Sequence, residues 1–312
     1  MASRHRGLVL LAAVVLALPW FLANKFHFQV AILIGLNALV CVGLNLLIGY
    51  AGQISLGHAA FFGLGAYVPA LLVDKLRWDS SLALAAGLAA VGLLAFAVAR
   101  PILRLKGHYL AMATLGLGII VAIVINRELD LTGGPDGMSV RAYRIGDLRL
   151  RGEWTWYWIT GGTLVLGVWL AQNLIDSPAG RALRALHGSE VAAESLGIDV
   201  AGFKVKAFVI SALYAGLAGA MTAHFLQFVT PIEAGFLRSI EFVTMVVLGG
   251  MASTLGVVVG AAILTLLPQL LTGFHDYEHL VLGAILMGMM IFLPKGLVPS
   301  LAALWTRWRA QS

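Results

Sequence analysis

Long runs of apolar residues constrain this chain more than any other feature of its sequence. The clearest cover Leu8–Ala23, Val30–Ile48, Ser81–Ala99, His108–Asn126 and Ala207–Val229. Each is close to the roughly 20 residues with which a helix crosses a bilayer, and lipid leaves the backbone no partner outside a helix. With 60% hydrophobic and only 12% charged residues, the chain also lacks the charge that would cover a soluble domain. The sequence therefore predicts an all-α polytopic membrane protein.

Weaker apolar runs, such as Ile240–Met251, Leu255–Leu271 and Leu280–Leu293, raise the expected total to about ten transmembrane segments. We expect them to form a single transmembrane domain over residues 1–312. The first run follows two arginines, but no small-residue cleavage site leads into a soluble domain. We therefore interpret this run as a span and not as a signal peptide.

Charge and cysteine content exclude several classes of protein. The net charge of +6 comes largely from basic residues at the ends of the apolar runs, which favours a membrane explanation over nucleic-acid binding. Cys41 is the one cysteine of the chain, so no disulfide framework can form. His275 and His279 have acidic residues between them, but without a third ligand a solvated loop is the better interpretation.

A glycine-rich stretch, Gly49–Tyr67, is a poor sequence for a helix that faces lipid. A break in such a helix must be buried in protein or line a water-filled path. We therefore place a substrate path here, and consider packing and helix capping as the alternative role for Ser55 and His58. Before it, Asn37 and Asn45 lie on one helix face, where we expect them to bond neighbouring helices. The candidate path residues of this stretch are Gly52, Gln53, Ser55, Gly57 and His58.

A shorter stretch in the second half of the chain, Leu248–Gly256, repeats the glycine pattern of the first. Broken helices in corresponding halves of a transporter are where the substrate path is usually found. We add Gly249, Gly250 and Ser253 to the path on this basis. Glu241 is the one carboxylate near a span interior, and it either contributes to the path or lies at the interface beside Arg238.

The polar segment from residue 174 to 206 predicts two short helices between membrane spans. Ser177 and Pro178 form an N-cap and a first helical residue, Ser189 caps a second helix, and Gly197 ends it. Short amphipathic helices between spans suit docking to a soluble partner. The candidate coupling residues are Arg181, Arg184, Glu190, Ala192, Ala193 and Gly197.

The other polar segment, residues 127–155, contains the turn-forming run Thr132–Gly137 and is followed by an aromatic belt that includes Trp154 and Trp158. Its glycines resemble a phosphate cradle, but no Lys-Ser/Thr pair follows them, so we exclude nucleotide binding here.

Three motifs together resemble the permease family of branched-chain (hydrophobic) amino acid ABC importers. Gly49 to Phe61 matches the GxxGxxSLGHAAF signature, and the TGGxxG element begins at Thr132. The third is the coupling loop, in which Ala192-Ala193, three residues, then Gly197 keep the spacing of the Glu-Ala-Ala motif. Val191 stands where the motif has glutamate, one place after Glu190. The resemblance covers most of the chain.

This resemblance implies a bacterial inner-membrane permease subunit for leucine, isoleucine and valine. It also implies a second homologous permease subunit, two ATPase subunits and a periplasmic substrate-binding protein. The chain has no Walker motif, so ATP hydrolysis is expected on partner chains, with no enzyme activity and no cofactor here. Alternatives are a permease for urea or short amides, an ion-coupled secondary carrier, and a membrane scaffold.

The distribution of basic residues predicts the orientation. With both termini in the cytoplasm, the segment 174–206 is cytoplasmic, the loop 127–155 is external, and the cytoplasmic side has a small excess of Lys and Arg. The excess is clear only if the external loop is translocated as one compact insert, so that its basic residues are left out of the count.

Overall fold

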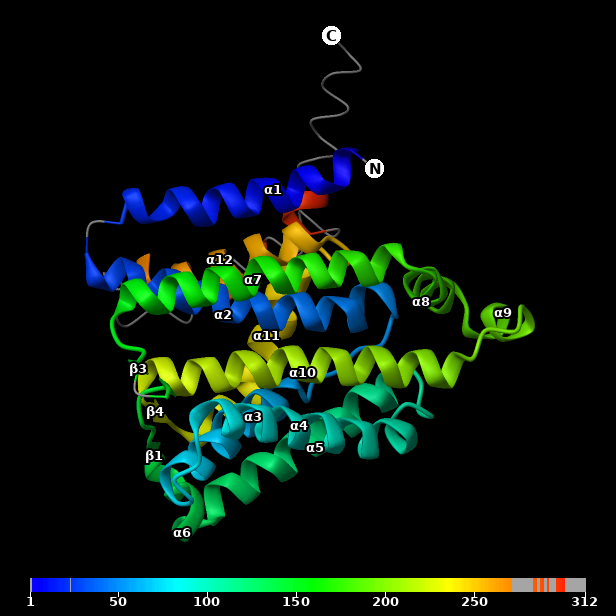
Figure 1. The fold of residues 1–312 in the computed structure, drawn as a ribbon. Coiled ribbons are helices and arrows are strands. Elements are labelled where there is room, and N and C mark those ends of the chain that lie inside the picture. Colours follow the sequence, from blue (N-terminus) through cyan, green and yellow to red (C-terminus); the bar gives the residue numbers. More distant parts are fainter. Residues whose placement is uncertain are drawn as a thin grey trace.

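The computed structural model describes residues 2–22, 24–146, 148–270, 283, 284, 287, 288, 291 and 296–300. Within these ranges the chain forms a bundle of helices (Figure 1). The helices are α1 (Ala2–Ala17), α2 (Lys25–Asn45), α3 (His58–Asp74), α4 (Ser80–Ile102), α5 (His108–Arg127), α6 (Leu129–Thr132), α7 (Glu153–Asp176), α8 (Pro178–Gly188), α9 (Glu190–Ser195), α10 (Val200–Leu226), α11 (Phe236–Gly249) and α12 (Thr254–Leu270), with short turns η1 (Leu18–Trp20), η2 (Leu46–Tyr50), η3 (Gly134–Asp136) and η4 (Pro231–Ala234).

Five helical stretches in the described part of the chain are long and apolar enough to cross a membrane. They are α2 with η2, α4, α5, α7 and α10, and three shorter apolar helices lie over Gly7–Trp20, His58–Asp74 and Thr254–Leu270. The prediction of a helical polytopic membrane protein is therefore confirmed. The expected last span, Leu280–Leu293, falls largely outside the described residues, and the predicted loop at His275–His279 lies outside them.

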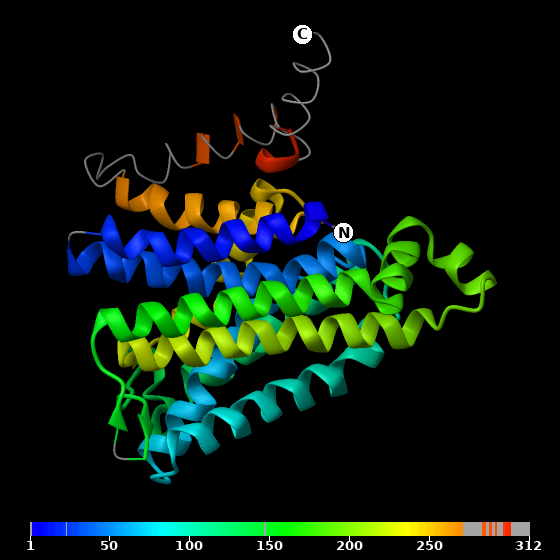
Figure 2. The same cartoon turned by 45° about the horizontal axis from the view of Figure 1, so that its top comes forward.

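Besides the helices, the described part of the chain has four very short strands. Four two-residue strands form two antiparallel pairs: β1 (Met138–Ser139) with β4 (Phe228–Val229), and β2 (Arg144–Ile145) with β3 (Leu148–Arg149). They lie with α6 at one end of the bundle, and α8 and α9 project from the opposite end (Figures 1 and 2). A two-residue strand has no periodic pattern, which is why the apolar runs did not reveal them.

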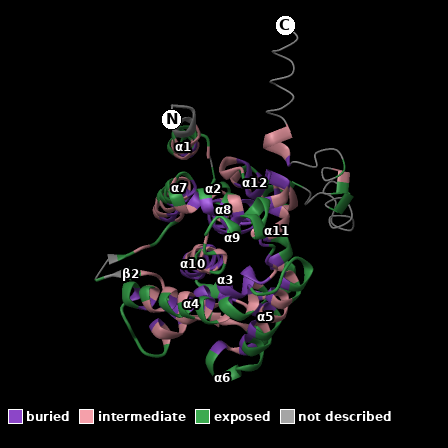
Figure 3. Cartoon of the chain, turned by 90° about the vertical axis from the view of Figure 1, so that its right-hand side faces the viewer, coloured by how far each residue is buried: buried purple, intermediate pink, exposed green. Residues whose placement is uncertain are grey.

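Helix α10 lies at the centre of the bundle (Figure 3). It packs against α2, α3 and α4, while α2 also packs against α7 and α12. Close contact depends on small residues: a Cβ atom on Gly65 of α3 would overlap the backbone of Gly216 in α10, and one on Gly219 would overlap the backbone of Phe62. Backbones that approach this closely are typical of helix packing in membranes.

Two breaks interrupt the long helices, as the glycine-rich stretches predict. At the first break (residues 46–57), α2 ends in the π-helical turn η2, and the chain runs without regular structure before α3 begins at His58. At the second break (residues 250–253), a short turn joins α11 to α12, which pack against each other. The first break is thus a π-helical turn followed by a long irregular segment, and the second is a tight turn.

Candidate coupling surface and substrate path

The α8–α9 segment (residues 178–195) has the two helices that the sequence predicts. The side chains of Ser177, Ser189 and Asp199 each accept a hydrogen bond from a backbone N–H in the first turn of the helix that follows. Gly197 has a φ of +78°, the left-handed conformation that ends α9. Val191 in this segment is 71% exposed, and Leu196, directly after it, is 79% exposed. Both apolar side chains lie at the end of the bundle, where a partner protein can reach them.

Helix α8 is anchored to the end of α7. Its apolar side, with Leu183 and Leu186, is buried. The Arg184 Nη2 donates a hydrogen bond to the carbonyl oxygen of Ile175 at 2.6 Å, where the last carbonyls of a helix attract a cation. Arg181 is exposed. Of the two predicted coupling arginines, one therefore positions α8 and the other faces outward.

Glu190, the first residue of α9, joins the α8–α9 segment to the first break. Its carboxylate lies 2.5 Å from Lys204 Nζ and 3.7 Å from Lys106 Nζ, and it accepts a hydrogen bond from Gln53 Nε2 at 3.2 Å. Partial burial opposes ionisation of Glu190, but the hydrogen bond and charge of Lys204, with Gln53 and Lys106, hold its pKa below the usual range. Glu190 is a predicted coupling residue and Gln53 a predicted path residue, and the structure brings the two into contact.

A second contact at the same place joins Gly52 to α8. Gly52 has a φ of +68°, and a Cβ atom on it would lie 3.0 Å from Nδ1 and 3.3 Å from Cα of His187. The backbone at Gly52 thus lies directly against the end of α8. The first break is in contact with both short helices.

Ser55 and His58 form a buried polar chain inside the bundle. The imidazole Nδ1 of His58 lies 2.9 Å from Ser55 Oγ, and its Nε2 lies 2.7 Å from Oγ of Ser211 in α10. The backbone N–H of Leu56 donates to Thr114 Oγ1 at 3.0 Å. Both ring nitrogens have a protein partner, so this arrangement matches the packing and capping alternative. A role in contacting substrate stays a prediction.

The second break is shaped by backbone contact between α11 and α12. A Cβ atom on Gly249 would overlap the carbonyl oxygen of Gly256, and the reverse also holds. Gly250 has a φ of +114°, and Ser253 Oγ accepts a hydrogen bond from the N–H of Gly256 at 3.1 Å. These residues form a helix–turn–helix joint, and nothing in their contacts distinguishes them as substrate ligands.

The two breaks touch through Ala252, which has a φ of +59°. Its N–H donates to Asn45 Oδ1 at 2.9 Å, and its carbonyl oxygen accepts from Tyr50 Oη at 2.7 Å. The prediction that Asn45 bonds a neighbouring element is confirmed. Asn37 also does so, because its Nδ2 donates to Thr265 Oγ1 of α12 at 3.0 Å.

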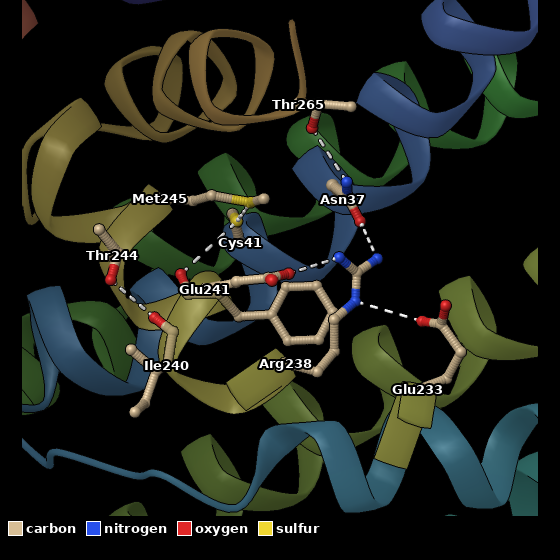
Figure 4. Close-up of polar contacts among 10 residues, drawn as sticks. Asn37, Cys41, Glu233, Arg238, Ile240, Glu241, Thr244, Met245 and Thr265 are labelled. Atoms are coloured by element: carbon tan, nitrogen blue, oxygen red, sulfur yellow. Dashed lines mark hydrogen bonds and ion pairs between the residues drawn. The ribbon is translucent and has the colours of Figure 1, made fainter. Parts of the chain in front are cut away.

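From the sequence, Arg238 is predicted only as a neighbour of Glu241. In the structure it contacts Glu241, Glu233 and Asn37 and lies between helices (Figure 4). Glu241 therefore pairs with Arg238, and its role in the path stays a prediction. The signal in the sequence was an arginine between two glutamates next to apolar residues, but their pairing depends on the fold.

The described residues contain no group of three or more His, Cys, Asp and Glu side chains that could hold a metal ion. What they do contain is broken helices inside a membrane bundle, connected to short amphipathic helices at one end. This combination is typical of the membrane-spanning part of a transport system.

The comparisons with known proteins identify which transport system. Residues 26–293 match the family described as branched-chain amino acid transport system / permease component. The chain is 34% identical to the high-affinity branched-chain amino acid transport system permease protein LivM of Escherichia coli K12, over 94% of this chain and 75% of that protein. The chain belongs to this permease family, and no solved structure matches it.

Two other relatives show how far the similarity extends. A probable LivM of Methanocaldococcus jannaschii is 26% identical over 64% of this chain and 62% of that protein. The permease protein LivH of Escherichia coli K12 is 31% identical over 39% of this chain and 40% of that protein. The chain is thus similar to two differently named permeases of one organism.

Proposed function

We propose that this permease subunit carries leucine, isoleucine and valine into the cell, as part of an importer driven by two separate ATPase subunits. Two relatives named as branched-chain amino acid permeases, at 33–34% identity over 94% of the chain, support this substrate class. The partial similarity to LivH supports a second, homologous permease subunit. A periplasmic substrate-binding protein completes the assembly.

The proposed location is the bacterial inner membrane, with about ten membrane segments and both termini in the cytoplasm. In this orientation the α8–α9 segment faces the cytosol, where an ATPase can reach it. The loop 127–155 lies with the small strands at the opposite end of the bundle (Figure 1) and would face the binding protein.

The observation that carries this proposal is the contact between Glu190 and Gln53. It joins the helix on which an ATPase would act to the break that we assign to the substrate path. Lys204, only 3% exposed, fixes Glu190 to the first turns of α10, the central helix of the bundle. A displacement of α9 would therefore move the start of α10 and the first break together.

The test is transport by the complete complex in proteoliposomes, with ATP on the cytoplasmic side. We expect labelled leucine to enter only with ATP, and labelled urea to be excluded. Uptake of urea in place of leucine would make the amide permease the correct alternative. Leucine uptake by this chain alone, driven by an ion gradient, would establish a secondary carrier.

The coupling contact is tested by Gln53→Met, which keeps the length of the side chain and removes its amide donor. We expect fewer leucine molecules transported per ATP hydrolysed, with ATP hydrolysis retained, because the ATPase surface is unchanged. Gln29→Met is the matched control, since Gln29 is exposed near the start of α2. An unchanged transport ratio in Gln53→Met would remove Gln53 from the coupling route.

A further inference from the structure

Arg238 lies well inside the bundle, away from both of its ends. It is in the first turn of α11, and its partner Asn37 is near the middle of α2. The next residue, Ser239, accepts a hydrogen bond from the N–H of Ala59 at 3.1 Å, so the first turns of α11 and α3 meet. Sites for substrates in transporters lie where interrupted helices begin near the middle of the membrane.

The guanidinium of Arg238 is held on three sides (Figure 4). Its Nη1 donates to Glu241 Oε2 at 2.8 Å, and its Nη2 donates to Asn37 Oδ1 at 2.9 Å. Its Nε lies 3.2 Å from Glu233 Oε2 as an ion pair. The Cζ atom lies 4.8 Å from the ring centre of Phe242 and 5.7 Å from that of Phe62.

The ion pair with Glu233 is less well satisfied than the other two contacts. Arg238 Nε and Glu233 Oε2 are both buried, and they lack the alignment of a hydrogen bond. Charges inside a membrane protein are costly unless paired, so imperfect pairing at this depth indicates a functional role. The group as a whole has one cation and two carboxylates.

Glu241 is the exposed edge of this charged group. Its side chain is 54% exposed, while that of Arg238 is 20% exposed. It stands on the exposed side of α11 among apolar neighbours, with Leu237 73% exposed and Ile240 37% exposed. A carboxylate at this depth cannot face hydrocarbon without a large penalty, so we infer that Glu241 does not face lipid.

We propose that Arg238, Glu233 and Glu241 form a binding site for the charged end of a free amino acid. The carboxylate of the substrate takes the place of Glu241 on the guanidinium, and its ammonium group is held by the released Glu241 and by Glu233. A planar guanidinium group binds a carboxylate through two parallel hydrogen bonds. The rings of Phe62 and Phe242 keep water from the guanidinium, which strengthens these contacts.

This exchange leaves the charge of the site unchanged, because a zwitterion has no net charge. It also requires both charges of the substrate. Urea and short amides have neither, so they cannot release Glu241 from Arg238. The inference rests on the proposed function, and within it the Arg238 group selects zwitterionic amino acids over neutral amides.

The experiment measures the number of labelled leucine molecules transported per ATP hydrolysed, using the complete complex in proteoliposomes with the leucine-loaded binding protein. Glu241→Gln removes one charge from the exposed edge of the site and leaves the buried contacts in place. Arg238→Lys keeps the charge and removes the paired donors. Glu128→Gln is the matched control, since Glu128 is an exposed carboxylate at the end of α5.

We expect both site variants to lower the ratio at least tenfold, with stimulated ATP hydrolysis within about twofold of the native complex, and Glu128→Gln to be unchanged. A merely structural group would lower ATP hydrolysis and transport together, and that result would overturn the inference. A native ratio in Glu241→Gln would overturn it while leaving the proposed function intact. If the native complex moves no leucine, the proposed function fails and the inference fails with it.

Discussion

The two breaks have similar sequences but different structures. The first runs without regular structure from Ala51 to Gly57, and its Gly52 has a φ of +68°. The second is a turn of four residues, beside which Gly249 and Gly256 bring α11 and α12 into backbone contact. In the first break, glycine lets the backbone change direction. In the second, it lets two helices pack closely.

The breaks also differ in what they touch. The first contacts the α8–α9 segment through Gln53 and Gly52. The second contacts the first through Tyr50, and it contacts the end of α2, just before the first break, through Asn45. Under the proposed coupling, movement of α8 and α9 would reach the first break directly and the second through it. Changes at the second break should mainly alter stability, and changes at the first should mainly alter coupling.

The largest effect is expected from Gly249→Val. The new side chain would overlap backbone atoms of Gly256, which cannot move aside as a side chain can. We expect a loss of about 3 kcal/mol of stability, measured as a lower melting temperature of the purified complex. Gly188→Ala is the control, because no atom lies within 4 Å of the added group. Equal melting temperatures for the two variants would contradict the packing role of the second break.

Glu190→Gln comes next, because it leaves the buried Lys204 without this carboxylate. We expect a cost of about 2 kcal/mol, below that of a fully buried pair since Glu190 is partly exposed, and a lower transport ratio.

The pH dependence of stability separates this effect from simple packing. The pKa of Glu190 is lowered in the folded chain, so its stabilisation is complete above its usual value near 4.5 and disappears as the pH falls through the lowered value. Melting temperatures of native and Glu190→Gln complexes should converge on acidification in that range. A constant difference would mean that the carboxylate charge has no part in the contact.

A smaller effect is expected from Gly52→Ala. The left-handed backbone costs an alanine about 1–2 kcal/mol, and the added Cβ presses on His187. Gly197→Ala has the same kind of strain, at a φ of +78°, with open space around it. We expect the two variants to lose similar stability. Only Gly52→Ala should also have a lower transport ratio, as measured in proteoliposomes. Should both variants keep the native ratio, contact with α8 does not carry the movement.

The smallest effect is expected from Asn45→Ala, which removes the acceptor for the N–H of Ala252. The expected loss is about 1 kcal/mol, since the backbone group loses its hydrogen bond. Asn173→Ala, at an exposed position in α7, is the control for chemical unfolding of the purified complex. If the two variants unfold alike, the contact between the breaks is not needed for stability.

What could be predicted from the sequence depended on short-range signals. Ser177 predicts the start of α8 and Gly197 predicts the end of α9, because caps act on backbone groups within a few residues. Glycine density indicated that both helices are interrupted, but not that one interruption is extended and the other tight, since glycine permits either geometry.

Contacts between distant residues could not be predicted in the same way. Gln53 and Glu190 are 137 residues apart, and Asn37 and Arg238 are 201 apart. No spacing within a helix or strand relates such pairs, and the packing of α2, α10 and α11 brings them together. Arg238 therefore looked like a residue at the edge of a span until its partners were known.

The central claim is that a cytosolic partner moves this permease through the α8–α9 segment, and the most direct measurement is the accessibility of that segment. Val191→Cys places a thiol on an exposed position of α9, while the native Cys41 is buried. Asp136→Cys, in the exposed loop at the opposite end, is the reference. In intact spheroplasts, a membrane-impermeant thiol reagent should label Asp136→Cys and should label Val191→Cys only after permeabilisation. Labelling of Val191→Cys in intact spheroplasts would place the segment outside the cell and contradict the account.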